Sequence, residues 1–139
     1  MATIISRGSL THDRLVAAGM WTAQVVLATV FAGAGIIKLS VPLDRLVESM
    51  AWVESVPAAL VRLVGAGEVL AAIALILPTA SRPLTRAAAA AASLLTVLML
   101  AAAMVHLLRG ELRMLPVNLT LAALAAFVAW ARLREHPAA

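Results

Sequence analysis

Four strongly polar residues interrupt the apolar segments of this chain, one in each segment: Lys38, Glu68, His106 and Asn118. A charged side chain at the centre of a membrane helix costs at least about 2.5–3.5 kcal/mol on insertion scales, so it is retained where partners offset the cost. A carboxyl group and an imidazole exchange protons, an ammonium neutralises a carboxylate, and an amide both donates and accepts hydrogen bonds. The set therefore predicts acid–base chemistry on a molecule held among apolar helices.

The segments that carry these residues are long enough to cross a bilayer. Hydrophobic residues make up 63% of the chain and charged residues 13%, with a mean hydropathy of +1.00, which is far from the balance of a soluble domain. A chain of 139 residues has room for about four spans of roughly 20 residues. We predict an all-α fold, a single integral membrane domain over residues 1–139, with transmembrane helices at approximately 16–39, 60–79, 85–108 and 115–131.

A further helical pattern lies between the first two spans. Its apolar residues recur at helical spacing with charged residues largely between them, namely Leu43, Leu46, Val47, Met50 and Val53. This pattern predicts a short interfacial amphipathic helix. Trp52 has the amphipathic ring that is favoured at headgroup depth. The segment is either a simple connector or a lid over a pocket.

Alternating helix directions place the four polar residues in the same half of the membrane. Glu68 lies about six residues inside Arg62, hence roughly 9 Å from the boundary opposite the chain termini. We predict one pocket in which Glu68 is the general base or acid and His106 its complement. Lys38 tunes Glu68 or steadies an oxyanion, and Asn118 orients the substrate. The predicted substrate-binding set comprises Asn118, Trp52, Gly35, Gly67 and Met99.

Each of these residues also has a purely structural interpretation. A lysine near a helix end commonly anchors the helix at the interface, and an asparagine inside a membrane commonly hydrogen-bonds between helices. Glycines such as Gly35 and Gly67 allow close helix packing. The sequence alone leaves both interpretations open.

Charge and cysteine content narrow the function classes. The 11 Lys and Arg residues exceed the seven acids. More of them flank the side with the termini, namely Arg7, Arg14, Arg82, Arg86, Arg132 and Arg134, against Arg45, Arg109 and Arg113 in the opposite connections, with Lys38 and Arg62 at helix ends there. By the positive-inside rule this predicts a multi-pass protein of the cell membrane with both termini cytoplasmic. The chain has no cysteine, which excludes disulfides and a CxxC redox relay. We expect no metal, no cofactor and no nucleic-acid partner.

Three short stretches resemble the DoxX-like family of small four-helix membrane proteins. The first is Phe31-Ala-Gly-Ala-Gly-Ile-Ile-Lys38-Leu, the second begins Gly65-Ala-Gly-Glu68-Val-Leu, and the third is the helix that ends at His106. The resemblance covers most of the chain. It implies a helical bundle and, through the family name, a link to the small membrane subunit of a thiosulfate:quinone oxidoreductase.

These observations leave three functions open. The first is a pocket for a hydrophobic small molecule, quinone- or isoprenoid-like, with acid–base chemistry such as isomerisation, epoxide ring opening or cyclisation. The second is a noncatalytic subunit that anchors or assembles a partner oxidoreductase. The third, transport through the bundle, fits less well, because the polar residues occupy only one half of it. A homo-oligomer is compatible with each of the three.

Overall fold

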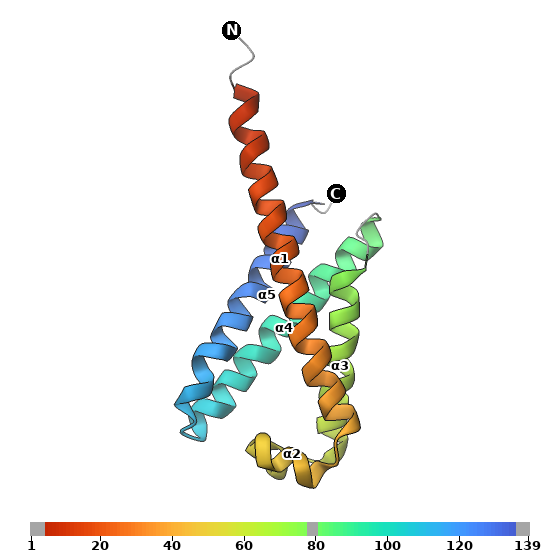
Figure 1. Cartoon of the computed structure of the whole chain (residues 1–139), viewed down its shortest axis with the longest axis vertical. Helices are drawn as coiled ribbons and strands as arrows, with labels where there is room; N and C mark the ends of the chain where they lie inside the picture. Colours follow the sequence, from red (N-terminus) through yellow and green to blue (C-terminus); the bar gives the residue numbers. More distant parts are fainter. Residues whose placement is uncertain (1–4, 78–80, 136–139) are drawn as a thin grey trace.

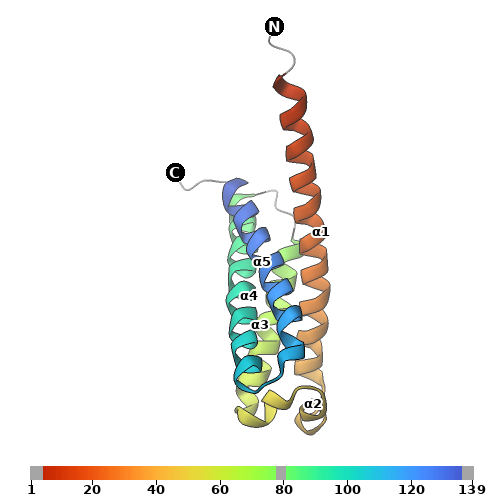
Figure 2. The same cartoon turned by 90° about the vertical axis from the view of Figure 1, so that its left-hand side faces the viewer.

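The computed structural model describes residues 5–77 and 81–135, and no strand is present in these two ranges. Four long helices follow one another along the chain (Figures 1 and 2): α1 (Ile5–Ser40), α3 (Ala58–Ile76), α4 (Arg82–Leu108) and α5 (Leu115–Glu135). Between α1 and α3 lie a short helix, α2 (Leu43–Ser49), and a 3-10 turn, η1 (Ala51–Ser55). A second 3-10 turn, η2 (Leu112–Met114), precedes α5. The predicted all-α fold is confirmed.

The four long helices form two packed pairs. Helix α1 packs along α3, and α4 packs along α5, while α3 with α4 and α1 with α5 make smaller contacts between the pairs. The pairs meet toward the end where α5 finishes, here called the terminal end, and diverge toward the end where α2 lies, here called the α2 end (Figure 1). The N-terminal part of α1 extends beyond the rest of the bundle (Figures 1 and 2).

The membrane-span predictions agree with the observed helices. Within the described residues, four segments are long and apolar enough to cross a bilayer: 14–40, 58–76, 83–108 and 112–134. The predicted spans lie at the same places along the chain, although residues 78 and 79 of the second one fall outside the described ranges. Helix α1 starts earlier than predicted because hydropathy reports only the apolar stretch, whereas a helix can continue into water.

The predicted amphipathic segment is a broken helix rather than a continuous one. Helix α2 ends at Ser49, and Met50 takes a non-helical backbone conformation (φ −135°, ψ 75°) before η1 begins. Leu46 and Val53 nevertheless point inward and pack with Val61 of α3 in a small apolar cluster. The segment therefore crosses the α2 end of the bundle as a bent strap (Figure 1).

The interior and exterior of the bundle differ in side-chain size rather than in polarity. The core holds many alanines together with a few large residues, chiefly Leu27, Phe31, Leu75, Leu95 and Val128. The outer faces carry exposed apolar residues such as Leu63, Leu70, Val97 and Leu108. Small inward residues let membrane helices approach closely, and large outward ones suit contact with lipid tails.

Candidate functional site

A cavity of about 880 Å³ lies between the two helix pairs at the α2 end. Residues of all four long helices line it, together with the α2–η1 strap and the turn between α4 and α5. Most of its wall is apolar, as at Val30, Phe31, Leu60, Leu98 and Leu121. The polar part includes Lys38, Glu68, His106, Glu111 and Asn118.

Lys38 and Glu68 form a buried ion pair at this cavity. The Lys38 Nζ donates hydrogen bonds to both carboxylate oxygens of Glu68, at 3.0 Å to Oε1 and 2.8 Å to Oε2. The two residues are only 6% and 3% exposed. Because each charge has the other as its partner, the pair satisfies the requirement that makes a membrane-embedded charge tolerable.

Two glycines bring Lys38 and Glu68 within reach of each other. A Cβ atom added at Gly35 would lie 2.6 Å from the backbone oxygen of Gly65, and one added at Gly65 would lie 2.8 Å from the Lys38 Cβ. Contacts this short leave no room for a side chain at either position. The glycines thus let α1 and α3 approach until the ammonium meets the carboxylate.

Arg62 adds a polar contact at the end of α1. Its guanidinium donates a hydrogen bond to the backbone oxygen of Lys38. Lys38 lies in the last turn of α1, where backbone oxygens have no partner within the helix. Arg62 therefore caps α1 beside the ion pair and fixes the backbone that carries the Lys38 side chain.

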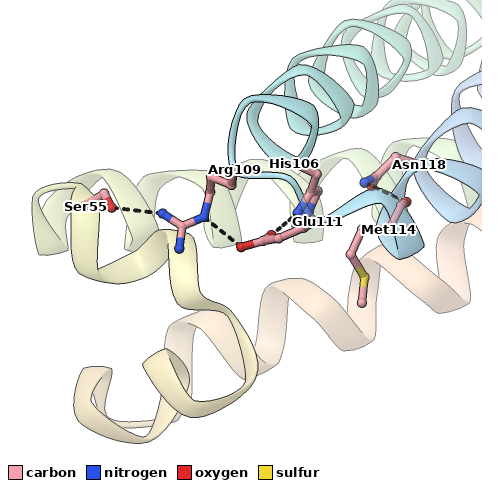
Figure 3. Close-up of polar contacts among 6 residues, drawn as sticks. All are labelled: Ser55, His106, Arg109, Glu111, Met114 and Asn118. Carbon is pink, nitrogen blue, oxygen red and sulfur yellow. Dashed lines mark hydrogen bonds and ion pairs between the residues drawn. The ribbon is translucent and has the colours of Figure 1, made fainter.

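His106 is paired with Glu111, which lies just beyond the end of its helix (Figure 3). The His106 Nδ1 and Glu111 Oε2 are 2.5 Å apart. Gly110 has a positive φ of 72°, its N–H donates to the Leu107 oxygen, and the Glu111 N–H donates to the His106 oxygen. These bonds form a Schellman cap. The cap returns the chain over the last helical turn and brings the Glu111 carboxylate to the imidazole.

Arg109 extends this contact toward the strap (Figure 3). Its Nε donates to Glu111 Oε1 at 2.8 Å, and one of its terminal nitrogens donates to the Ser55 hydroxyl at 3.3 Å. Hydrogen bonds from Arg109 and then His106 lower the pKa of the Glu111 carboxyl below its ordinary value. Glu111 is therefore an anion at neutral pH, and it binds Arg109, which itself links the end of α4 to Ser55 of η1.

Asn118 lies one turn into α5 and borders the same cavity. Its side-chain nitrogen donates to the backbone oxygen of Met114 at 3.1 Å. Only the nitrogen end of the amide can donate, so the bond orients the group and directs its oxygen away from Met114. In the described ranges no hydrogen bond of that oxygen is found.

Comparison with known proteins identifies the group to which the chain is related. The profile of the DoxX-like family matches residues 22–128. The chain belongs to the DoxX-like family. No curated protein and no solved structure matches it significantly. For this DoxX-like protein the resemblance seen in the sequence is thus confirmed.

The structure gathers most of the predicted site residues of the DoxX-like chain at one cavity. Lys38, Glu68, His106 and Asn118 all border it, and so do two predicted substrate contacts, Trp52 and Met99. Glu68 contacts Lys38, the residue expected to tune it, whereas His106, expected as the complement of Glu68, contacts Glu111 instead.

The remaining two predicted substrate contacts lie elsewhere. Neither Gly35 nor Gly67 is among the residues that line the cavity. Gly35 packs against α3, and the space around the Cα of Gly67 is open, with no atom within 4 Å of an added Cβ. The structural interpretation, close helix packing, therefore describes Gly35, whereas Gly67 has neither role in this arrangement.

Two features of the DoxX-like chain were not found by the sequence reasoning. Glu111 was assigned to a polar turn between spans and was not predicted as a site residue. Gly110 after the last helical turn is nevertheless a known signal for a cap that returns the chain toward the helix. Arg132 was placed at the end of the last span, yet it is 3% exposed and donates to Gln24 at 2.5 Å. Gln24 in turn donates to the Leu75 oxygen at 2.7 Å. These contacts join α1, α3 and α5 at the terminal end.

Proposed function

We propose that this DoxX-like membrane protein binds a hydrophobic small molecule in the cavity at the α2 end and carries out acid–base chemistry on its polar part. The observation that carries the proposal is the cavity itself, whose volume is about 880 Å³. Small-molecule sites are typically concave and apolar, with a few polar groups that orient the ligand, and occupy about 300–1,000 Å³. The volume and wall of this cavity fit that description.

The proposal assigns the two ends of the ligand to different parts of the wall. Its apolar body lies along Phe31, Leu98 and Leu121, near the middle of the bundle. Its polar end lies near His106 and Asn118, close to the strap. A quinone- or isoprenoid-like molecule has this division between a long apolar part and a small polar part.

The contacts favour His106 over Glu68 as the group that exchanges a proton with the ligand. Both oxygens of Glu68 are occupied by Lys38, so a proton on Glu68 would break a buried ion pair. His106 has one ring nitrogen on Glu111 and a second that remains for a ligand. A carboxylate that orients an imidazole is a recurring feature of general bases. In this proposal Lys38 and Glu68 do not exchange protons with the ligand, and their ion pair joins α1 to α3 beside the cavity.

Ligand binding is tested by identifying what copurifies with the protein. After gentle detergent extraction, native mass spectrometry is expected to show the protein with a non-phospholipid hydrophobic molecule. Ala102→Trp, which fills the cavity wall, should abolish this adduct. Ala90→Trp is the matched control, because Ala90 lies exposed on the same helix and outside the cavity.

The same experiment separates the proposal from the anchoring alternative. A stoichiometric partner enzyme with no bound small molecule would favour a noncatalytic subunit of an oxidoreductase complex. Ordinary phospholipid bound equally by both tryptophan variants would contradict a dedicated site. Once a substrate is identified, Glu68→Gln and His106→Gln test the chemistry by turnover. Undiminished activity of His106→Gln would exclude His106 as the proton acceptor.

We also infer that the termini face the cytoplasm, which puts the cavity in the membrane half away from the cytoplasm. The inference rests on the arginine distribution described above. The chain has no native cysteine, so single cysteines introduced at exposed positions can report their side. Ser81→Cys should react with an impermeant maleimide only after the membrane is opened, whereas Leu112→Cys should react in intact cells. The reverse pattern would invert the assignment.

A further inference from the structure

The charged groups around the cavity are largely committed to one another. Lys38 is bound to Glu68, and Glu111 is bound to both His106 and Arg109. The other charged residues of the wall, Glu48 and Arg113, are exposed and opposite in sign. At the buried part of the wall, a ligand carboxylate or phosphate would have to displace Glu68 or Glu111 from its partner. The site thus has no ammonium or guanidinium reserved for an anion deep inside the wall.

The Glu111 contact fixes the tautomer of the neutral His106 ring. A carboxylate only accepts hydrogen bonds, so the His106 nitrogen that lies 2.5 Å from Glu111 Oε2 carries the proton. In the neutral imidazole the other nitrogen, Nε2, is then an acceptor. Among residues 5–77 and 81–135 no hydrogen bond of Nε2 is found. In its neutral form His106 therefore presents a lone pair on Nε2 that can accept a hydrogen bond from a ligand donor.

Asn118 offers a complementary pair of groups at the same cavity. Its amide uses one N–H on the Met114 oxygen, which leaves the carbonyl oxygen and the second N–H. A hydroxyl group is the smallest uncharged group that donates one hydrogen bond and accepts others. It can donate to an imidazole nitrogen and accept from an amide N–H.

From this polarity we propose that the ligand's polar end is a hydroxyl group, so that the site takes an uncharged hydrophobic alcohol or phenol and selects it through His106 Nε2. The inference rests on the proposed function and specifies its ligand class. A ketone, an ether or a quinone carbonyl would present an acceptor to an acceptor. Such ligands lose the bond that a hydroxyl makes.

The experiment compares probes of equal length that differ only in the polar end. The full-length protein in lipid nanodiscs is titrated with the C15 isoprenoid alcohol farnesol, its methyl ether and the corresponding carboxylic acid. Quenching of Trp52, which lines the cavity, reports binding, and Trp52→Phe identifies its share of the signal. The alcohol is expected to bind about three- to tenfold more tightly than the ether, the value of one hydrogen bond.

Variants assign that preference to His106. In His106→Phe the preference should fall to about one, and His106→Gln, which keeps an acceptor, should restore part of it. Glu111→Gln leaves the imidazole in place but no longer fixes which nitrogen carries the proton, so it should also reduce the preference. This variant keeps the test valid if His106→Phe fails to fold.

The outcomes separate the two proposals. Equal binding of the alcohol and the ether, both blocked by Ala102→Trp, overturns the hydroxyl inference and leaves the proposed function standing. Tightest binding by the acid also overturns the inference. An alcohol preference that survives in His106→Phe assigns the selection to another group and overturns the role of Nε2. Binding of none of the three probes overturns both proposals.

Discussion

Buried polar groups occur at both ends of the bundle, in different surroundings. At the terminal end, Arg132 bonds Gln24 and lies 5.0 Å from the centre of the Trp21 ring, and Gln24 bonds the backbone of α3. At the α2 end, Lys38 bonds Glu68 and His106 bonds Glu111. The groups at the α2 end border the cavity, whereas Arg132, Gln24 and Trp21 are not part of its wall.

The comparison shows why a buried polar residue in a membrane helix does not by itself indicate a binding site. Every buried polar group in lipid needs a partner, and helix packing supplies one at the terminal end. At the α2 end the helix pairs diverge (Figure 1), and the paired groups there line the cavity. Two features distinguish the site: the cavity itself, and the His106 ring and Asn118 amide that line it, each with a hydrogen bond from only one of its polar atoms among the described residues.

The largest expected effect comes from unpairing the buried charges at the α2 end. Lys38→Met leaves Glu68 without its partner, and we expect it to lower the free energy of unfolding by about 3–5 kcal/mol. The double variant Lys38→Met/Glu68→Leu removes both charges and should be less destabilised. Helicity measured during titration with a denaturing detergent gives the comparison. If the double variant had a lower free energy of unfolding than the single one, the pair would contribute more to stability than mutual neutralisation.

A second prediction concerns the close contact that positions this ion pair. Gly35→Val places atoms where the backbone of α3 already lies, so α1 and α3 must separate, at a cost of about 1–3 kcal/mol. Gly33→Ala is the matched control in the same helix, since nothing lies within 4 Å of its added Cβ. The same detergent titration should show Gly33→Ala at least as stable as the natural chain. Equal effects of the two substitutions would contradict a specific helix contact.

At the terminal end we expect a substitution to lower stability without lowering ligand affinity. Arg132→Met removes the donor that satisfies the Gln24 oxygen, and leaving a buried polar group unsatisfied costs about 1–3 kcal/mol. Because Arg132 does not line the cavity, farnesol affinity of the folded variant should equal that of the natural chain. An affinity loss as large as that of Ala102→Trp would make both ends parts of one site.

The sequence was sufficient to predict the helices and the half of the membrane in which the polar residues meet. Long apolar segments specify spans, and alternation of direction places Lys38, Glu68, His106 and Asn118 at one end. The sequence offered Lys38 as a partner for Glu68, but it did not offer Glu111 as the partner of His106, which depends on the cap that returns the chain after α4. The close contact between Gly35 and Gly65, which lets Lys38 reach Glu68, is likewise absent from any hydropathy pattern.

Arg132 shows a related limit of sequence reasoning. A charge after an apolar run indicates the end of a span, because the chain is expected to reach water there. The guanidinium instead returns to Gln24, more than 100 positions earlier in the chain, on α1. A long side chain can place its charge far from its own backbone position. The position of Arg132 after an apolar run therefore does not reveal that its side chain packs inside the bundle at the terminal end.

The smallest expected effect is a pH dependence of the Glu111 contacts at the α2 end. Arg109 and His106 lower the pKa of Glu111 below its ordinary value of 4.5. The ionised carboxylate therefore adds stability that is complete above about that ordinary value and is lost as the pH falls through the lowered one. Protonated Glu111 no longer attracts Arg109, so the Arg109 side chain that contacts Ser55 of the strap loses its charged partner.

This dependence can be measured as the difference in melting temperature between the natural chain and Glu111→Gln. The difference should shrink as the pH is lowered past 4.5, because the natural chain then loses the same charge that the variant lacks. Glu54→Gln, at an exposed acid of η1, controls for general effects of acid removal. A difference that stays constant down to pH 3, roughly the lower limit for ordinary carboxyl titration, would show that Glu111 acts by packing rather than by charge.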